Sequence, residues 1–111
     1  MRTFMLATIA VSAACLGLAA PACAADALAG AAKAKEVCQA CHGLDGNSPS
    51  GDFPRIGGQY PDYLAKALRD YKSGARKNAI MAGFAGTLSR VDIDNLAAYY
   101  ASQPSVVATK H

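Results

Sequence analysis

The sequence predicts an all-α domain, and three observations support that class. No segment alternates between apolar and polar residues over a useful length, so we expect no strand. Residues 60–74 and 89–104 place apolar side chains at helical spacing behind a residue that can begin a helix. Residues 26–37 are rich in strong helix formers.

The N-terminus has the pattern of a secretory signal peptide. Arg2 precedes an apolar run from Phe4 to Leu18, and Ala22-Cys23-Ala24 then forms a cleavage site of the A-x-A type. The run is shorter than the ~18 apolar residues that a membrane-spanning helix needs. We therefore expect removal of residues 1–24, export to the periplasm without stable membrane insertion, and one mature domain of residues 25–111.

The charge of the chain is nearly balanced. Eleven Lys and Arg against eight Asp and Glu give a formal net charge of +3, which the loss of Arg2 would reduce by one. No acidic or basic tail is present. Strong attraction to nucleic acid or to anionic lipid is therefore not expected.

The first helix of the mature chain is expected at Leu28–Val37, with Asp26 as its N-cap. We expect it to continue into the following cysteine-containing segment and to stop at Gly43. Gly30 lies inside it and costs about 1 kcal/mol relative to alanine. That glycine is either tolerated near the helix start or marks the close approach of another helix.

A long irregular loop is expected at Leu44–Gln59. Glycine, proline, asparagine and serine recur through it without helical spacing. Its length of about 16 residues exceeds ordinary connections in a compact domain. The loop should therefore be functional or wrapped around something.

Two further helices and one short element follow. Tyr60-Pro61-Asp62 opens a helix that Gly74 ends. A short turn or helix is expected within Ile80–Leu88. Ser89 can cap the last helix, and Pro104 lies just beyond its end. The apolar faces of the two longer helices comprise Tyr63, Leu64, Ala67, Leu68 and Tyr71 in the first, and Ile93, Leu96, Ala97 and Tyr100 in the second.

The most informative segment is Cys38-Gln39-Ala40-Cys41-His42. Two thiols at this spacing occur in thiol redox sites, in zinc sites and in haem c attachment sites. A histidine directly after the second thiol favours haem c, because each thiol can add to one vinyl group while the imidazole ligates the iron.

The predicted compartment narrows these alternatives. Cys15 and Cys23 would leave with the signal peptide, and two remaining cysteines are too few for a disulfide framework. A zinc site would have only these two cysteines, His42 and the terminal His111 as strong ligands. An exported redox dithiol would normally follow a strand, and none precedes Cys38.

A haem would need a second axial ligand or an open iron face. Met81 is the only methionine left after signal removal, 39 residues beyond His42. A single methionine is more often core filler, but with haem present its thioether would stabilise reduced iron. His111 is the competing ligand, and as the last residue we expect it to be frayed.

The mature chain resembles the class I c-type cytochromes, in particular the small bacterial periplasmic monohaem type and single lobes of the dihaem kind. The matching segments run in order through nearly the whole mature chain: Cys38 to Gly46, Phe53 to Gln59, Tyr63-Leu64, Lys72 to Arg76, Ile80-Met81, Leu88-Ser89 and Leu96 to Tyr100. The resemblance implies a cytochrome c fold of three to five helices around one covalent haem, with the first and last helices crossing at Gly30 against Leu96 and Tyr99 or Tyr100.

The resemblance also implies roles for individual residues. The Pro54 carbonyl would accept a hydrogen bond from His42 Nδ1, which fixes the ring and raises its basicity. His42 and Met81 would be the axial ligands. Candidates for holding haem propionates or the methionine loop are Arg55, Gln59, Tyr60, Arg76 and Asn78, each of which could equally be a solvated surface residue.

The function expected from this resemblance is electron transfer without enzymatic activity, by a chain that is monomeric when free. Its partners would be redox proteins such as a dehydrogenase or oxidase complex. Lys33, Lys35, Lys66, Lys72 and Lys77 could form a docking ring or an ordinary solvated surface. The main alternative is a cytochrome subunit within a periplasmic dehydrogenase complex. A haem enzyme or gas sensor would need an open iron, and a thiol oxidoreductase would need reactive thiols.

Overall fold

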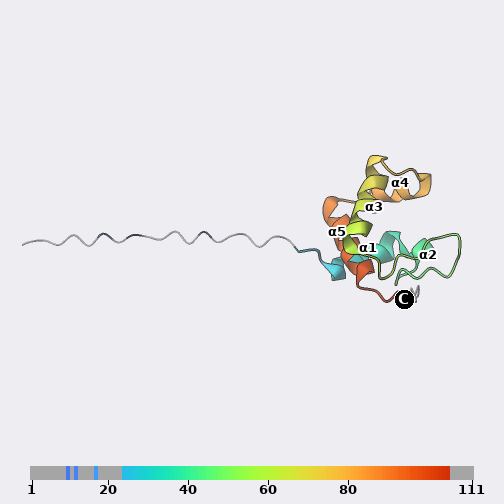
Figure 1. Cartoon of the computed structure of the whole chain (residues 1–111), viewed down its shortest axis with the longest axis horizontal. Coiled ribbons are helices and arrows are strands. Elements are labelled where there is room, and N and C mark those ends of the chain that lie inside the picture. The colour runs from blue at the N-terminus through green and yellow to red at the C-terminus, as the bar shows by residue number, and fades with distance from the viewer. Residues whose placement is uncertain (1–9, 11, 13–16, 18–23, 106–111) are drawn as a thin grey trace, which may run out of the picture.

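The computed structural model describes residues 10, 12, 17 and 24–105, and this part of the chain is helical without any strand. Its helices are α1 (Ala27–Val37), α2 (Gln39–His42), α3 (Pro61–Ser73), α4 (Ala79–Gly86) and α5 (Arg90–Ala101) (Figure 1). The all-α prediction is confirmed. Most of the expected signal peptide, with Cys15 and Cys23, lies outside the described residues, as does His111. Among the described residues, no helix has the length and apolar character required to cross a membrane.

Helix α1 begins as expected and ends earlier than expected. The Asp26 carboxylate accepts hydrogen bonds from the backbone N–H groups of Leu28 and Ala29, at 2.9 and 3.1 Å. The helical segment does stop at Gly43, as predicted, but α1 itself already ends at the first cysteine of the motif. Cys38 adopts φ −113° and ends α1, and the separate α2 turn carries Cys41 and His42. A φ so far from the helical value interrupts the helix at the first cysteine.

The crossing of α1 and α5 is close enough to exclude any side chain at Gly30. A Cβ there would lie 2.0 Å from the Asn95 carbonyl oxygen and 2.8 Å from the Tyr99 Cβ. Asn95 also accepts a 2.7 Å hydrogen bond from the Asp26 N–H through its Oδ1. The crossing of the first and last helices is confirmed. Gly30 lies nearest to Asn95, rather than to the expected Leu96, and Tyr99 is the other residue close to it.

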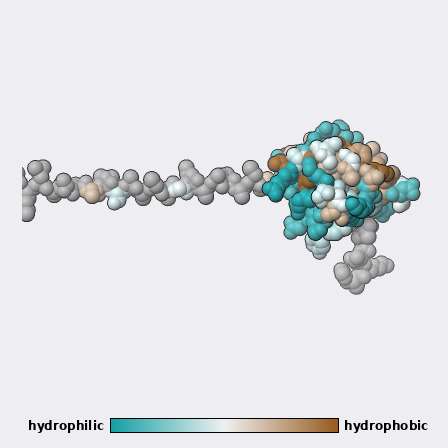
Figure 2. Space-filling view, turned by 90° about the horizontal axis from the view of Figure 1, so that it is seen from above, coloured by the Kyte–Doolittle hydropathy of each residue, from teal (hydrophilic) through white to brown (hydrophobic). Residues whose placement is uncertain are grey.

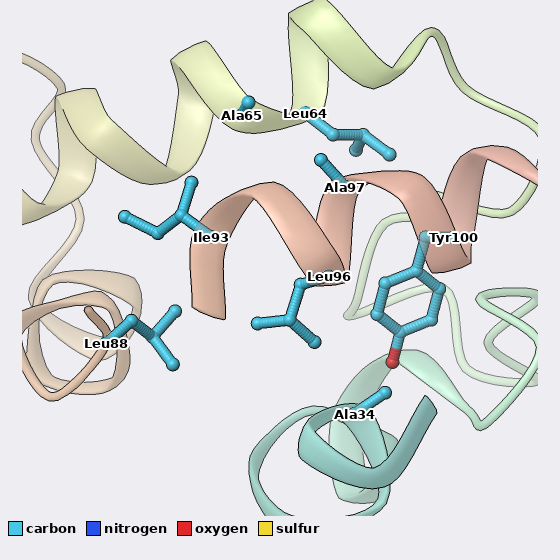
Figure 3. Packing of buried hydrophobic residues seen from close by; sticks show 8 residues of the cluster. All are labelled: Ala34, Leu64, Ala65, Leu88, Ile93, Leu96, Ala97 and Tyr100. Atoms are coloured by element: carbon cyan, nitrogen blue, oxygen red, sulfur yellow. The ribbon is translucent and has the colours of Figure 1, made fainter. Parts of the chain in front are cut away.

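Helix α5 lies between α3 and α1 and supplies half of the buried hydrophobic cluster (Figure 3). Ser89 and Asp92 form a capping box at its start, each side chain accepting from the other's backbone N–H at 3.0 Å. Such a box satisfies two donors that a helix start would otherwise leave unpaired. The buried cluster consists of Ala34, Leu64, Ala65, Leu88, Ile93, Leu96, Ala97 and Tyr100. The predicted buried face of this helix is therefore confirmed, and the buried polar residue Asn95 is an addition to it.

Helices α3 and α4 form the other side of the domain. Pro61 occupies the first turn of α3, and Gly74 ends it in the left-handed conformation at φ 84°, as expected for a helix stop. Asn78 caps α4, which begins one residue before the expected short element. Figure 2 shows a surface of mixed character, with hydrophobic residues gathered at the upper right of the domain in this view.

The segment between α2 and α3 is irregular, as predicted, but closely held. The Gly46 carbonyl accepts hydrogen bonds from the N–H groups of Ile56 and Gly57, at 2.7 and 2.9 Å, which joins the two arms of the loop. Gly58 N–H donates to the Tyr100 carbonyl at 2.9 Å. The loop is therefore attached to α5 as well as closed on itself.

Candidate haem-binding site

His42 lies at the end of α2 with its ring buried. Its Nδ1 is 2.8 Å from the Pro54 carbonyl oxygen, so the hydrogen bond expected between these residues is present. A carbonyl can only accept, and therefore Nδ1 carries the proton. The neutral ring then presents the lone pair of Nε2, which is the form of imidazole that ligates metal.

The two cysteines are half-buried, and no disulfide joins them. Burial raises the pKa of the Cys38 thiol to about 11, against the opposing effect of a hydrogen bond from Tyr100. Reactive cysteines have lowered pKa values, because the thiolate is the nucleophile. The environment of Cys38 therefore does not favour a thiol oxidoreductase.

Two adjoining cavities extend from these cysteines into the domain, with volumes of about 200 and 150 Å³. Five residues line both of them: Cys38, His42, Pro54, Tyr71 and Met81. The first is also lined by core residues such as Leu64, Leu68, Leu96 and Ala97, and the second by Cys41, Phe53, Ile80 and Phe84. The shared lining makes them two parts of one largely apolar space, which Cys38 and Cys41 help to line.

Met81 is the third residue of α4 and borders this space opposite the loop. Its backbone N–H donates to the Asn78 side chain at 3.0 Å, which fixes it in the first turn of the helix. The side chain is half-buried and lines both cavities, as does His42. The structure thus brings to one cavity lining an imidazole and a thioether that are 39 residues apart in sequence.

Three of the five polar candidates line the first cavity. Arg55 donates through Nε to the Ser48 carbonyl at 3.3 Å. Gln59 accepts from the Tyr60 N–H at 2.9 Å. Arg76 also borders this cavity. These three could reach polar groups at the edge of a bound ligand.

Arg76 has the most defined surroundings of the three. Its guanidinium lies 4.8 Å from the centre of the Tyr71 ring and 3.4 Å from the Tyr63 hydroxyl, to which it donates. Asn78 lines the second cavity and caps α4, whereas Tyr60 is 79% exposed and borders neither cavity. The structure therefore does not bring Tyr60 to the site.

Two tyrosines of α5 hold the segment that follows His42, a role that sequence analysis missed. Tyr99 donates to the Leu44 carbonyl at 2.6 Å, and Tyr100 donates to the Gly43 carbonyl at 3.2 Å. Their rings meet edge to face, with centres 5.1 Å apart. The sequence showed two adjacent aromatic residues on a buried helix face, but it did not show where their hydroxyls would point.

Three lysines of the suggested docking ring have contacts within the domain. Lys33 pairs with Glu36 at 3.1 Å, Lys66 pairs with Asp70, and Lys72 donates to the Leu88 carbonyl. Exposed pairs of this kind contribute little to stability. These contacts favour the ordinary mixed-charge surface over a dedicated ring.

Comparison with known proteins agrees with this arrangement. A family model described as "Cytochrome C oxidase, cbb3-type, subunit III" matches residues 25–99. The chain is 51% identical over 80 residues to cytochrome c4 of Pseudomonas aeruginosa, a match that spans 72% of the chain and 39% of the relative. It is 42% identical over 83 residues to cytochrome c-554(548) of Halomonas halodenitrificans, of which it covers 99%.

Two further proteins extend the comparison. The chain is 45% identical over 64 residues to a thiosulfate dehydrogenase electron acceptor of Thiomonas intermedia, covering 57% of this chain and 30% of that protein. The crystal structure of reduced recombinant cytochrome c4 from Pseudomonas stutzeri superposes with a TM-score of 0.68 at 44% identity, over 73% of this chain and 47% of that one. The chain thus spans less than half the length of the cytochromes c4 that it matches.

The residues around the cavity fit the covalent haem c of these proteins. Two thiols, an imidazole with an available Nε2 and a thioether line it, and the remaining walls are mostly apolar. The cofactor is haem c. The chain belongs to the class I c-type cytochromes.

Proposed function

We propose that this chain is a periplasmic electron-transfer protein that carries one electron between redox partners on a single haem c. Cys38 and Cys41 attach the haem, and His42 and Met81 ligate its iron. The single observation that carries this proposal is that His42 and Met81 line the same apolar cavity, with His42 Nδ1 already engaged by Pro54. When bound, haem c supplies a one-electron ferric/ferrous couple.

The residues of the chain would serve this function by holding the cofactor still. The Pro54 carbonyl keeps the His42 ring in one tautomer and one orientation. The apolar walls at Leu64, Leu68 and Leu96 exclude water from the interior. With His42 and Met81 both holding the iron, no substrate would reach it, and the chain would be a carrier rather than an enzyme.

Export belongs to the same proposal. Residues 1–24 would be the signal peptide, cleaved before Ala25, and residues 25–111 would form the cytochrome domain. In this arrangement, Cys38 and Cys41 lie in the exported domain, where the haem would be attached covalently. Released from the membrane, the protein would be a monomer between encounters, since transient redox contacts commonly bury less than about 1,200 Å² in total.

Spectra and mass of the purified protein test the proposal. A denatured mass increased by one haem, and a reduced spectrum of a c-type cytochrome, are the expected results. In the oxidised protein, the band near the red end that is characteristic of Met–Fe(III) ligation should be present. Titratable thiols at Cys38 and Cys41 would contradict attachment, and absence of the red-end band would contradict ligation by Met81.

A second candidate function is that of an electron-accepting subunit in a periplasmic dehydrogenase complex. The similarity to a protein named as a thiosulfate dehydrogenase electron acceptor favours it. Affinity purification of the chain from its native host separates the two. A free carrier elutes as a small monomer, whereas a subunit elutes with a larger catalytic chain in fixed proportion.

A further inference from the structure

The segment that follows α5 lies directly against the loop that carries Pro54. Asn47 Nδ2 donates to the Pro104 carbonyl at 2.8 Å, across 57 residues of sequence. At Gly58, a Cβ would lie 2.7 Å from the Ser105 Cβ and 3.1 Å from the Gln103 carbonyl oxygen. We refer to Gln103–Ser105 as the C-terminal strap.

Asn47 connects the strap to both arms of the loop. Its backbone N–H donates to the Asp45 carboxylate at 2.9 Å, and its Nδ2 also reaches the Asp45 carbonyl at 3.3 Å. A Cβ at Gly57 would lie 2.9 Å from Asn47 Nδ2 and 3.2 Å from the Pro104 carbonyl oxygen. The Asn47 amide therefore fills the narrow space between Asp45, Gly57 and the strap.

Two sets of contacts lead from Asn47 toward Pro54. Beside Asn47, the Gly46 carbonyl holds the N–H groups of Ile56 and Gly57. On its other side, the Ser48 carbonyl accepts from Arg55 Nε at 3.3 Å. The three residues after Pro54 are thus fixed to the two neighbours of Asn47.

We infer that Asn47, braced by the C-terminal strap, is a positioning residue for the His42 imidazole. It acts through Pro54, whose carbonyl is the hydrogen-bond acceptor of His42 Nδ1. The inference rests on the proposed function, in which His42 ligates the haem iron. A hydrogen bond at Nδ1 orients a ligating histidine and raises its basicity. Loosening the loop should therefore weaken donation to ferric iron and raise the reduction potential.

The test compares Asn47→Ala with Ser89→Ala in the haem-loaded protein. Ser89→Ala removes the α5 cap at a site with no described contact to the loop and serves as the control for general destabilisation. The measurements are the reduction potential and, in the reduced protein, the exchange rate of the His42 Nδ1 proton by NMR. Asn47→Ala should raise the potential and speed exchange about tenfold relative to the control, as expected for the loss of one hydrogen bond that limits local opening.

Shortening the chain tests the same contact by removing Pro104, the hydrogen-bond partner of Asn47. Ending it after Gln103 removes the Pro104 carbonyl and should raise the potential and the exchange rate as Asn47→Ala does, while the same shortening of the Asn47→Ala chain should add little. Additive effects of the two changes would overturn the coupling between Asn47 and the strap.

Two other outcomes separate failure of this inference from failure of the proposed function. If Asn47→Ala lowers the melting temperature as Ser89→Ala does, but changes neither potential nor exchange, then Asn47 is structural and the positioning role is overturned. If the wild-type protein holds no covalent haem, the proposed function falls, and this inference falls with it.

Discussion

The two sides of the haem cavity are built differently. The histidine side is the loop after α2, whose carbonyls at Gly43 and Leu44 accept from Tyr100 and Tyr99. The methionine side is α4, a short helix that packs on α3. On α4, Ile80 is 62% and Phe84 44% exposed.

His42 and Met81, the two proposed ligands, therefore differ in how firmly the chain holds them. The orientation of His42 is already set by Pro54, and that loop is joined to α5. The Met81 N–H donates to the Asn78 side chain, and a Cβ at Gly83 or Gly86 would meet nothing within 4 Å, although Ala85 on the same helix is fully buried. Elements with few buried contacts open first in native proteins. We expect the methionine side to open before the histidine side.

Removing the covalent attachment should have the largest effect, because both sides face the space that the haem fills. In the double variant Cys38→Ser/Cys41→Ser, the small core lacks its staple. We expect no cooperative transition at the melting temperature of the haem-loaded protein, as followed by circular dichroism. Hydrogen exchange should show α4 losing protection more completely than α1 and α5. A cooperative melt at the wild-type temperature would contradict this.

Replacing the methionine should open one side and leave the other intact. Met81→Ala removes the thioether that we propose ligates the iron. Because a thioether stabilises ferrous iron, the reduction potential should fall by a sizeable part of the ~0.8 V range that axial ligands control. The red-end band should disappear, and added imidazole should bind. Voltammetry and absorption spectra measure these effects. An unchanged potential and spectrum would show that Met81 is not a ligand.

Removing the N-cap of α4 or that of α5 should destabilise the fold by nearly the same free energy, but only the first should affect the methionine side. Asn78→Ala and Ser89→Ala each remove an N-cap side chain, worth about 1 kcal/mol. Only Asn78→Ala loosens the first turn of α4, so it alone should speed the binding of added imidazole to the ferric protein. Stopped-flow absorption measures that rate. Equal acceleration in both variants would mean that opening is global rather than confined to α4.

Acid below about pH 4 should slightly destabilise the loop on the histidine side. The hydrogen bond from the Asn47 N–H holds the pKa of Asp45 below its usual value of 3.8. A carboxyl with a lowered pKa in the folded state stabilises the fold fully above its unfolded pKa, and this stabilisation is lost as pH falls through the folded value. Unfolding below about pH 4 should therefore be slightly less pH-dependent in Asp45→Asn. Identical acid profiles would show that Asp45 contributes nothing.

Local patterns were sufficient to predict most of the helical structure. Asp26, Gly74 and Ser89 have the local chemistry of helix ends, and the structure uses all three as caps. The break at Cys38 was missed because glutamine and alanine after it are good helix formers. What ends α1 there is a backbone dihedral, which residue propensities do not specify.

The site itself was predicted in part. The CxxCH spacing and the single late methionine mark candidate ligands, because a histidine directly after the second cysteine favours haem c and Met81 is the only methionine expected in the mature chain. Asn47, Asn95 and the tyrosine hydroxyls act on backbone groups far away in sequence. Their partners are carbonyls and N–H groups, which every residue has, so the sequence carries no signal for these contacts.

The crossing of α1 and α5 has a consequence for how the protein is made. Asp26 and Asn95, which it joins, are 69 positions apart. A contact of such long range forms late, since the intervening chain must first be brought together. The CxxCH segment lies near the beginning of that interval. Tyr99 and Tyr100, which donate to the backbone just after His42, lie shortly beyond its end. In the export that we propose, the attachment cysteines would therefore emerge well before the helix that closes over them. That order leaves an interval in which the thiols are reachable for thioether formation.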